Sequence, residues 1–212
     1  MLDEAGAQPL EFFADEILTQ LPRFALSLGA PEVSSLARYL AELDLWRRRT
    51  NLTGPLNGED LVTHSLESVL GVGLISHGAR VIDIGSGAGL PGVPLAIAEP
   101  RLTVALLEPR SLRAAFLRHV VRTVPIRNAD VVEERIEKLA GRQYEVATIR
   151  ALGNIPRLIG AADFLVGGGA LLSWTTEPQA LARSLQRAFS LETVLPIPES
   201  RRRVLALLRK RI

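Results

Sequence analysis

Residues 80–97 read RVIDIGSGAGLPGVPLAI, and this stretch decides the fold. An apolar segment at 81–84 predicts a short buried strand, and the residues after it predict a glycine-rich turn and a helix. Gly85, Gly87 and Gly89 make the turn. Glycine adopts backbone conformations closed to other residues and lets a ligand approach the main chain. We therefore expect a ligand at the carboxyl end of the first strand of an open α/β sheet.

The segments on either side divide the chain into two parts. Residues 10–28, 31–47 and 59–70 carry apolar side chains at helical spacing, which predicts an all-helical first third. After residue 80, strands and helices alternate. Strands are predicted at 102–107, 128–132, 144–149 and 170–174, helices at 93–98, 111–122, 155–165 and 178–189, and a closing hairpin at 191–197 and 203–208. The alternation favours an α/β fold with a mainly parallel sheet and helices on both faces. We expect a helical extension, residues 1–78, packed on a ligand-binding domain, residues 79–212.

The composition limits the class of protein. A chain of 212 residues that is 47% hydrophobic and 23% charged is long enough to bury a core and too apolar for disorder. The absence of cysteine excludes disulfides, thiolate zinc sites, iron–sulfur clusters and a cysteine nucleophile. The acidic N-terminus lacks an apolar signal core, and no apolar stretch reaches the length of a membrane span. We expect a cytoplasmic protein with no membrane partner.

The basic residues are almost all arginine, since Lys138 and Lys210 are the only lysines. Arginine binds phosphate in a bidentate manner and stacks on bases, so a nucleic-acid partner is one interpretation. An arginine-biased genome is the other. Arginines cluster at 47–49 and 201–203 and are spread over 110–127.

The ligand follows from the acidic residues beside the glycines. A dinucleotide site reads G-x-G-x-x-G, whereas here the third glycine comes one residue earlier. Asp83 ends the first strand, which suits a cationic amino-acid moiety better than a pyrophosphate. Glu108 ends the next strand, about 20 residues further on, where a carboxylate can accept both hydroxyls of a ribose. Together these features describe a site for S-adenosylmethionine. The alternative is a plain glycine-rich turn with a helix-capping acid.

Three motifs carry a family resemblance that covers most of the chain. They are WRRRTNLTG at 46–54, LVTHSLESVL at 61–70 and IDIGSGAGLPGVPLAI at 82–97. They resemble the bacterial small-subunit rRNA guanine-N7 methyltransferases, called RsmG or glucose-inhibited division protein B. The resemblance implies the class I, Rossmann-like, S-adenosylmethionine-dependent methyltransferase fold. That fold has a mainly parallel seven-stranded sheet with an antiparallel last strand, here with an N-terminal helical extension.

The resemblance also implies residues for the cofactor S-adenosylmethionine. Gly85 and Leu90 match loop positions that line it, Glu108 matches the ribose acid, and Ile136 and Glu137 match residues that pack around the adenine. The full cofactor-binding set is Asp83, Gly85, Ser86, Gly87, Gly89, Leu90, Glu108, Ile136, Glu137 and Arg150. Leu112, Ile149 and Thr63 replace a lysine, a serine and an arginine that are usual in the family, and these departures touch substrate-side positions more than the cofactor loop.

Arg150 matches an arginine beside the reaction site, and we predict that it is the catalytic residue. Guanine N7 already carries an exposed lone pair and needs no general base. Catalysis then comes mainly from placing N7 in line with the methyl group. The pKa of arginine is too high for base work, so Arg150 is expected to orient a phosphate, the cofactor or the guanine.

Candidate RNA-binding residues surround this site: Arg47, Asn51, Thr53, His64, Arg118 and Arg122. Helical spacing puts Arg118 and Arg122 on one face, where they predict a positive rim for a phosphate backbone. The others have structural alternatives. Arg47 can complement a helix dipole, Asn51 and Thr53 can pin a turn, and His64 favours a structural hydrogen bond over a substrate contact.

The leading hypothesis is N7 methylation of a guanine in 16S rRNA, with 16S rRNA or the small ribosomal subunit as partner. A methyltransferase of the same fold acting on another RNA or a small molecule is a second hypothesis. A nicotinamide-dependent oxidoreductase is disfavoured by the glycine spacing, and a non-catalytic RNA-binding relative is disfavoured by the intact acids and glycines. With no cysteine and no clustered acids, we expect no metal site. We also expect a monomer.

Overall fold

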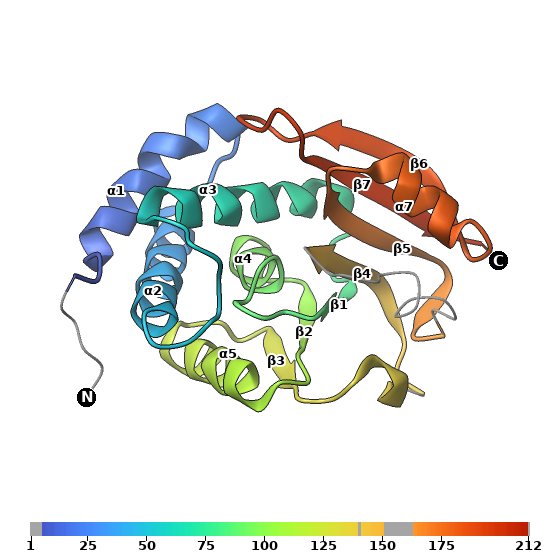
Figure 1. Ribbon diagram of the computed structural model, residues 1–212, viewed down its shortest axis with the longest axis horizontal. Helices are drawn as coiled ribbons and strands as arrows, with labels where there is room; N and C mark the ends of the chain where they lie inside the picture. The colour runs from blue at the N-terminus through green and yellow to red at the C-terminus, as the bar shows by residue number, and fades with distance from the viewer. Residues whose placement is uncertain (1–5, 140, 151–162, 212) are drawn as a thin grey trace.

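A seven-stranded sheet forms the centre of the protein (Figure 1). The computed structural model describes residues 6–139, 141–150 and 163–211. The strands are β1 (Arg80–Ile84), β2 (Thr103–Leu107), β3 (Ala129–Val132), β4 (Tyr144–Arg150), β5 (Leu165–Thr175), β6 (Phe189–Pro196) and β7 (Val204–Lys210). Their order is β3-β2-β1-β4-β5-β7-β6. Neighbours from β3 to β5 pair in parallel, whereas β7 pairs antiparallel with β5 and β6. The predicted mainly parallel sheet with an antiparallel last strand is confirmed.

The α-helices lie before, between and after the first strands. They are α1 (Leu10–Gln20), α2 (Ala30–Arg47), α3 (Gly58–Val69), α4 (Gly92–Ala98), α5 (Ser111–Thr123) and α7 (Pro178–Leu185). Helix α3 begins with a capping box, in which the Asn57 side chain accepts from the Asp60 amide at 2.7 Å and Asp60 accepts from the Asn57 amide at 3.0 Å. None of the helices in the described part of the chain is long and apolar enough to cross a membrane.

Three predicted helix boundaries are wrong. The helix expected over 10–28 ends at Gln20 and is followed by a 3-10 turn, because Pro22 lacks the amide that would continue the ladder. The helix expected over 178–189 ends at Leu185, and Phe189 begins β6 with a buried side chain. Leu165, expected to end a helix, begins β5. Asp163 and Phe164 lie in a turn, and residues 155–162 of that predicted helix lie outside the described residues.

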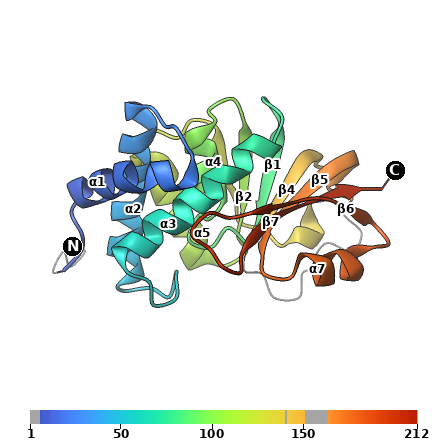
Figure 2. The same cartoon turned by 90° about the horizontal axis from the view of Figure 1, so that it is seen from above.

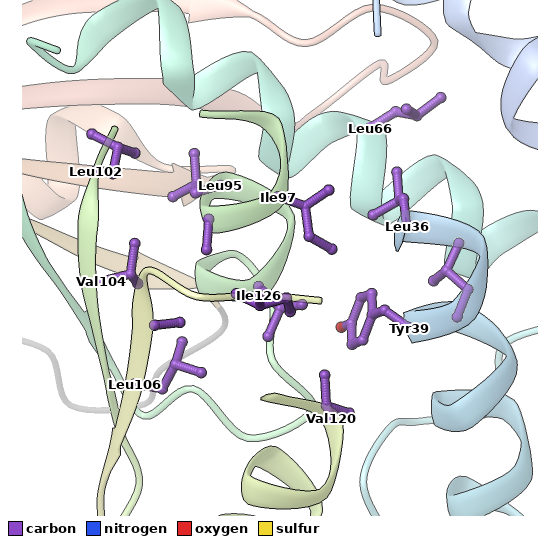
Figure 3. Packing of buried hydrophobic residues seen from close by; sticks show 14 of the residues in the cluster. Leu36, Tyr39, Leu66, Leu95, Ile97, Leu102, Val104, Leu106, Val120 and Ile126 are labelled. Atoms are coloured by element: carbon purple, nitrogen blue, oxygen red, sulfur yellow. The ribbon is translucent and has the colours of Figure 1, made fainter. Parts of the chain in front are cut away.

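The core lies on both faces of the sheet. Alternating strand residues point to opposite sides, so Val81 joins one apolar cluster and Ile82 joins the other. The first cluster is built with α1 to α5, and the second with α7. Figure 3 shows the first cluster, in which Leu36 of α2 points toward Ile97 of α4 and Tyr39 of α2 points toward Ile126. Figures 1 and 2 place α1 and α2 at one end of the molecule and α7 toward the other, while α3 runs from the first end across the middle. Helices α1, α2 and α3 therefore pack on the sheet through a continuous core.

The strand order fixes where a ligand can bind. From β1 the chain moves outward through β2 to β3, and it then returns to β4 on the other side of β1. The crevice at the carboxyl ends of β1 and β4 is the topological switch point, where open α/β sheets bind ligands. The glycine-rich turn after β1 lies at this edge.

Candidate active site

The turn after β1 is tied to the end of β2. Gly85 and Ser86 donate their amides to the Leu107 carbonyl at 2.8 and 3.0 Å. Gly89 has a φ of +97°, and a Cβ there would lie 2.9 Å from Val93. Only glycine combines that backbone angle with that contact. These contacts fix the backbone conformation of the turn at the carboxyl end of β1.

Asp83 holds this turn from inside the protein. Its side chain is buried, and it accepts hydrogen bonds from the Thr148 hydroxyl at 2.9 Å and from the Gly92 amide at 3.2 Å. Burial raises the pKa of Asp83 to about 6. A Cβ on Gly92 would lie 2.4 Å from Leu106, so only glycine lets this amide approach the carboxylate. Asp83 thus positions the loop, and its predicted contact with the cofactor stays a prediction.

Glu108, the predicted ribose acid, bonds the same turn. Its carboxylate accepts from the Gly87 amide at 3.0 Å through one oxygen and from the Arg110 amide at 2.9 Å through the other. A carboxylate has about four lone-pair sites, so both oxygens keep capacity for a hydroxyl donor. The geometry holds Glu108 at the end of β2 while leaving it able to bind two further donors.

A cavity of about 650 Å³ opens beside Glu108. Its walls are Ile84 at the end of β1 and Gly85 after it, Leu107 at the end of β2 with Pro109 and Arg110 beyond it, and the segment 133–138 after β3. The structure thus brings together Gly85, Ile136 and Glu137, three of the predicted cofactor residues. Asp83, Ser86, Gly87, Gly89, Leu90, Glu108 and Arg150 are not among the lining residues. Sequence reasoning missed Pro109 and Arg110, although their place directly after a strand-ending acid was an available signal.

Arg150 ends β4 and reaches across to α3. It donates through Nη2 to Glu67 Oε2 at 2.6 Å and through Nη1 to the His64 carbonyl at 2.9 Å. The other Glu67 oxygen accepts from Arg203 Nη2 at 2.5 Å. The Glu67 side chain is 0% exposed and that of Arg150 is 10% exposed. Two guanidinium groups therefore share one buried carboxylate at the carboxyl edge of the sheet, a cluster that the sequence motifs did not reveal.

The Asn51–Thr53 segment approaches the glycine turn. Arg113 of α5 donates to the Asn51 carbonyl at 3.2 Å, and its other terminal nitrogen lies 3.5 Å from the position of a Cβ on Gly87. The Thr53 hydroxyl is buried and has no hydrogen-bond partner among the described residues. A buried hydroxyl without a partner costs free energy unless a ligand or water bonds it. The predicted role of this segment at the substrate cleft stays a prediction.

The three predicted RNA-binding arginines differ in what they contact. Arg47 donates to the buried Asp44 at 2.8 Å and also donates to the Leu56 carbonyl, so its side chain, 16% exposed, links α2 to the following loop. Arg118 lies 2.6 Å from Glu133 but is 51% exposed. Arg122 is exposed one turn further along α5. The predicted pair on α5 therefore does share an open face, whereas Arg47 lies within the fold.

His64 is held in its neutral form. Burial lowers its pKa to about 4, and the nearby charge of Arg150 acts in the same direction. Its carbonyl accepts the Arg150 hydrogen bond, which is a backbone role that any residue could fill. The imidazole is therefore neutral at physiological pH and lies close to the two arginines.

Replacing His64 with glutamine is expected to change how stability depends on pH. The folded pKa lies below the ordinary value of 6.5, so the contribution of His64 is fully present above pH 6.5 and is lost as pH falls toward 4. The pKa of Asp83 is raised, so its contribution to stability grows as pH falls from about 6, which is opposite to the effect of His64 over part of the same pH range. Urea unfolding at pH 7 and pH 5 should show that acidification costs the wild type about 1 to 2 kcal/mol more than the variant. Equal costs in the two proteins would contradict a buried neutral His64.

The chain matches one family over most of its length. Residues 32–191 match the family described as GidB: rRNA small subunit methyltransferase G. A protein of Roseiflexus castenholzii named Ribosomal RNA small subunit methyltransferase G is 40% identical over 155 residues, or 68% of this chain and 65% of that relative. A protein of Chromobacterium violaceum with the same name is 38% identical over 68% of this chain and 70% of its own. The match to the Roseiflexus protein thus spans slightly less than two thirds of that relative.

The fold matches a solved methyltransferase. A structure described as a SAM dependent methyltransferase from Aquifex aeolicus aligns with a TM-score of 0.61 over 76% of this chain and 96% of that one. The sequence identity is 11%, so the likeness concerns the fold alone. It confirms the predicted class I methyltransferase architecture for the sheet described above.

Proposed function

We propose a function from the premise that this chain belongs to the GidB family, rRNA small subunit methyltransferase G. We infer that it transfers a methyl group from S-adenosylmethionine to N7 of a guanine in 16S rRNA. The observation that carries this proposal is the cavity at the carboxyl ends of β1, β2 and β3, which is bounded by Gly85 of the glycine turn on one side and by Ile136 and Glu137 on the other.

The residues at this cavity fit S-adenosylmethionine. A volume of about 650 Å³ lies within the range of small-molecule sites. The Gly85 backbone borders it, and the Glu108 carboxylate beside it keeps capacity for two hydroxyl donors. We propose that Glu108 binds the ribose and that Ile136 and Glu137 flank the adenine. When bound, S-adenosylmethionine supplies an electrophilic methyl group.

Arg150 then orients the acceptor and does not remove a proton. Among the described residues, Glu67, Ser68 and the His64 carbonyl accept its hydrogen bonds. A guanidinium has five N–H groups, so it keeps donors for an acceptor such as guanine O6 or a phosphate. The N7 lone pair would need no base, because it would accept the methyl group as the methyl–sulfur bond breaks. A neutral thioether would leave, and the positive charge would pass from the sulfonium to the purine. The protein then has only to align N7 with the methyl group, and a guanidinium held in place can do this by donating hydrogen bonds to the guanine or a phosphate.

We propose the remaining features on the same premise. The substrate-binding side includes Asn51, Thr53 and the exposed arginines of α5. The chain acts in the cytoplasm, where 16S rRNA or the small ribosomal subunit is its partner, and it acts as a monomer. Residues 1–78 form the helical extension and residues 79–212 form the cofactor-binding domain.

A transfer assay tests the function. The protein is incubated with S-adenosylmethionine labelled in the methyl group and with small-subunit rRNA, either free or in assembled subunits, and the RNA is digested to nucleosides. We expect label in N7-methylguanosine and in no other nucleoside. Label in another nucleoside, or in transfer RNA alone, would favour the alternative of another RNA substrate. Cofactor binding without transfer to any RNA would contradict the proposal.

A further inference from the structure

We propose that the turn between β6 and β7, residues 197–203, is an RNA-contact surface on which Arg201 and Arg202 bind phosphate groups of the substrate RNA. This inference rests on the proposed function and extends it to a part of the chain that carries no cofactor motif. Figures 1 and 2 show the turn, in red, beside α3.

The turn has a fixed backbone. Ile197 is 1% exposed and belongs to the apolar cluster shared with α1 to α5. The Ser200 amide donates to the Ile197 carbonyl at 3.2 Å, and the Ser200 hydroxyl accepts from the Arg203 amide at 2.9 Å. The Arg203 guanidinium also donates hydrogen bonds to the buried carboxylate of Glu67, which holds the residue in place. Contacts on both sides of Arg201 and Arg202 therefore hold these two residues in place, which lowers the entropy cost of binding through them.

The turn lies at the edge where the methyl acceptor has to enter. Val204, the first residue of β7, pairs with Thr175 of β5, next to Trp174, which pairs with Arg150 of β4. The two oxygens of Glu67 divide their bonds between Arg150 and Arg203. One carboxylate thus connects the turn to the residue that we expect to orient the guanine. A phosphate bound by the turn would belong to nucleotides close to the reacting base.

Arg201 and Arg202 lack the acidic partners that several other arginines of the described residues have. Arg80, Arg118 and Arg209 are each paired with a glutamate. Arg201 and Arg202 are exposed, and no ion pair or hydrogen bond to their side chains is found within the described ranges. One exposed acid, Glu199, lies in the same turn. Unpaired guanidinium groups on a rigid turn are suited to bidentate phosphate binding. Small-subunit rRNA offers a dense array of phosphates as the partner.

The test compares two double variants with equal charge changes. In Arg201→Gln/Arg202→Gln the proposed surface is removed. In Arg127→Gln/Arg142→Gln two exposed arginines are removed just before β3 and β4, at the opposite edge of the sheet. Affinity for small-subunit rRNA is measured over a series of KCl concentrations. Affinity for S-adenosylmethionine and thermal stability are measured in parallel as controls for the cofactor site and the fold.

We expect Arg201→Gln/Arg202→Gln to bind the RNA at least tenfold more weakly, with a salt slope smaller by about one to two. The Arg127→Gln/Arg142→Gln control should stay within twofold of the wild type, and cofactor affinity should be unchanged in both. If the two variants lost RNA affinity equally, or if the first lost none, this inference would be overturned. The proposed function would still stand in that case, provided that the wild type methylated the rRNA. If the wild type neither bound nor methylated small-subunit rRNA, the proposed function would fail, and this inference with it.

Discussion

Replacement of Glu67 by alanine is expected to lower the free energy of unfolding by about 3 to 5 kcal/mol, because it leaves buried positive charge without a partner. The Glu67 side chain is 0% exposed and bonds Arg150 and Arg203 at 2.6 and 2.5 Å. Its backbone carbonyl also accepts from Trp174 at 2.7 Å, so the residue joins α3 to β4, to β5 and to the turn before β7. Urea unfolding of wild type and variant measures the loss directly.

Glu145 supplies the matched control for this prediction. It also bonds an arginine, Arg80, at 2.8 Å, but the two side chains are 41% and 50% exposed. An exposed ion pair contributes about 1 kcal/mol or less, so Glu145→Ala should cost little. If Glu67→Ala cost no more than Glu145→Ala, the buried cluster would not hold the helical extension to the sheet as described.

Arg150→Ala is expected to lower turnover of rRNA methylation by about 100-fold or more, since a misplaced acceptor loses that much rate. Affinity for S-adenosylmethionine should change by less than a few fold, because Arg150 is not among the residues that line the cavity. Single-turnover methyl transfer and equilibrium cofactor binding give the two quantities separately. Unchanged turnover at full cofactor affinity would remove Arg150 from the reaction.

Arg203→Gln separates a role in the reaction from a role in the fold. Both arginines bond Glu67, so either substitution leaves that carboxylate with one partner. A loss of turnover caused only by freeing Glu67 would be similar in the two variants. A role of Arg150 in orienting the acceptor predicts that Arg150→Ala is impaired far more than Arg203→Gln.

The local patterns predicted the fold well. The strand, the glycine turn and the following helix are encoded within residues 80–97, so short-range periodicity is sufficient to place them. The same reasoning extended the last helix to Phe189, because Leu181, Leu185 and Phe189 keep helical spacing. Phe189 instead pairs with Lys210 in the sheet, which is a contact that spacing along the chain cannot reveal.

The site was predicted in part, for a related reason. Gly85, Ile136 and Glu137 meet at the cavity because strand order brings successive carboxyl ends to one edge. Glu67 and Arg203 are 136 positions apart, and nothing in either segment indicates that they pair. The ion pair of Arg47 was predictable from the sequence, because Asp44 stands three residues before it on the same helix face.

The central claim is tested most directly by measuring N7-methylguanosine in 16S rRNA from cells with and without the gene. We expect the modified nucleoside at one guanine to disappear in the absence of the gene. It should return when the wild-type chain is supplied and should stay absent with Arg150→Ala expressed to the same level. An N7-methylguanosine content that is the same with and without the gene would contradict the account.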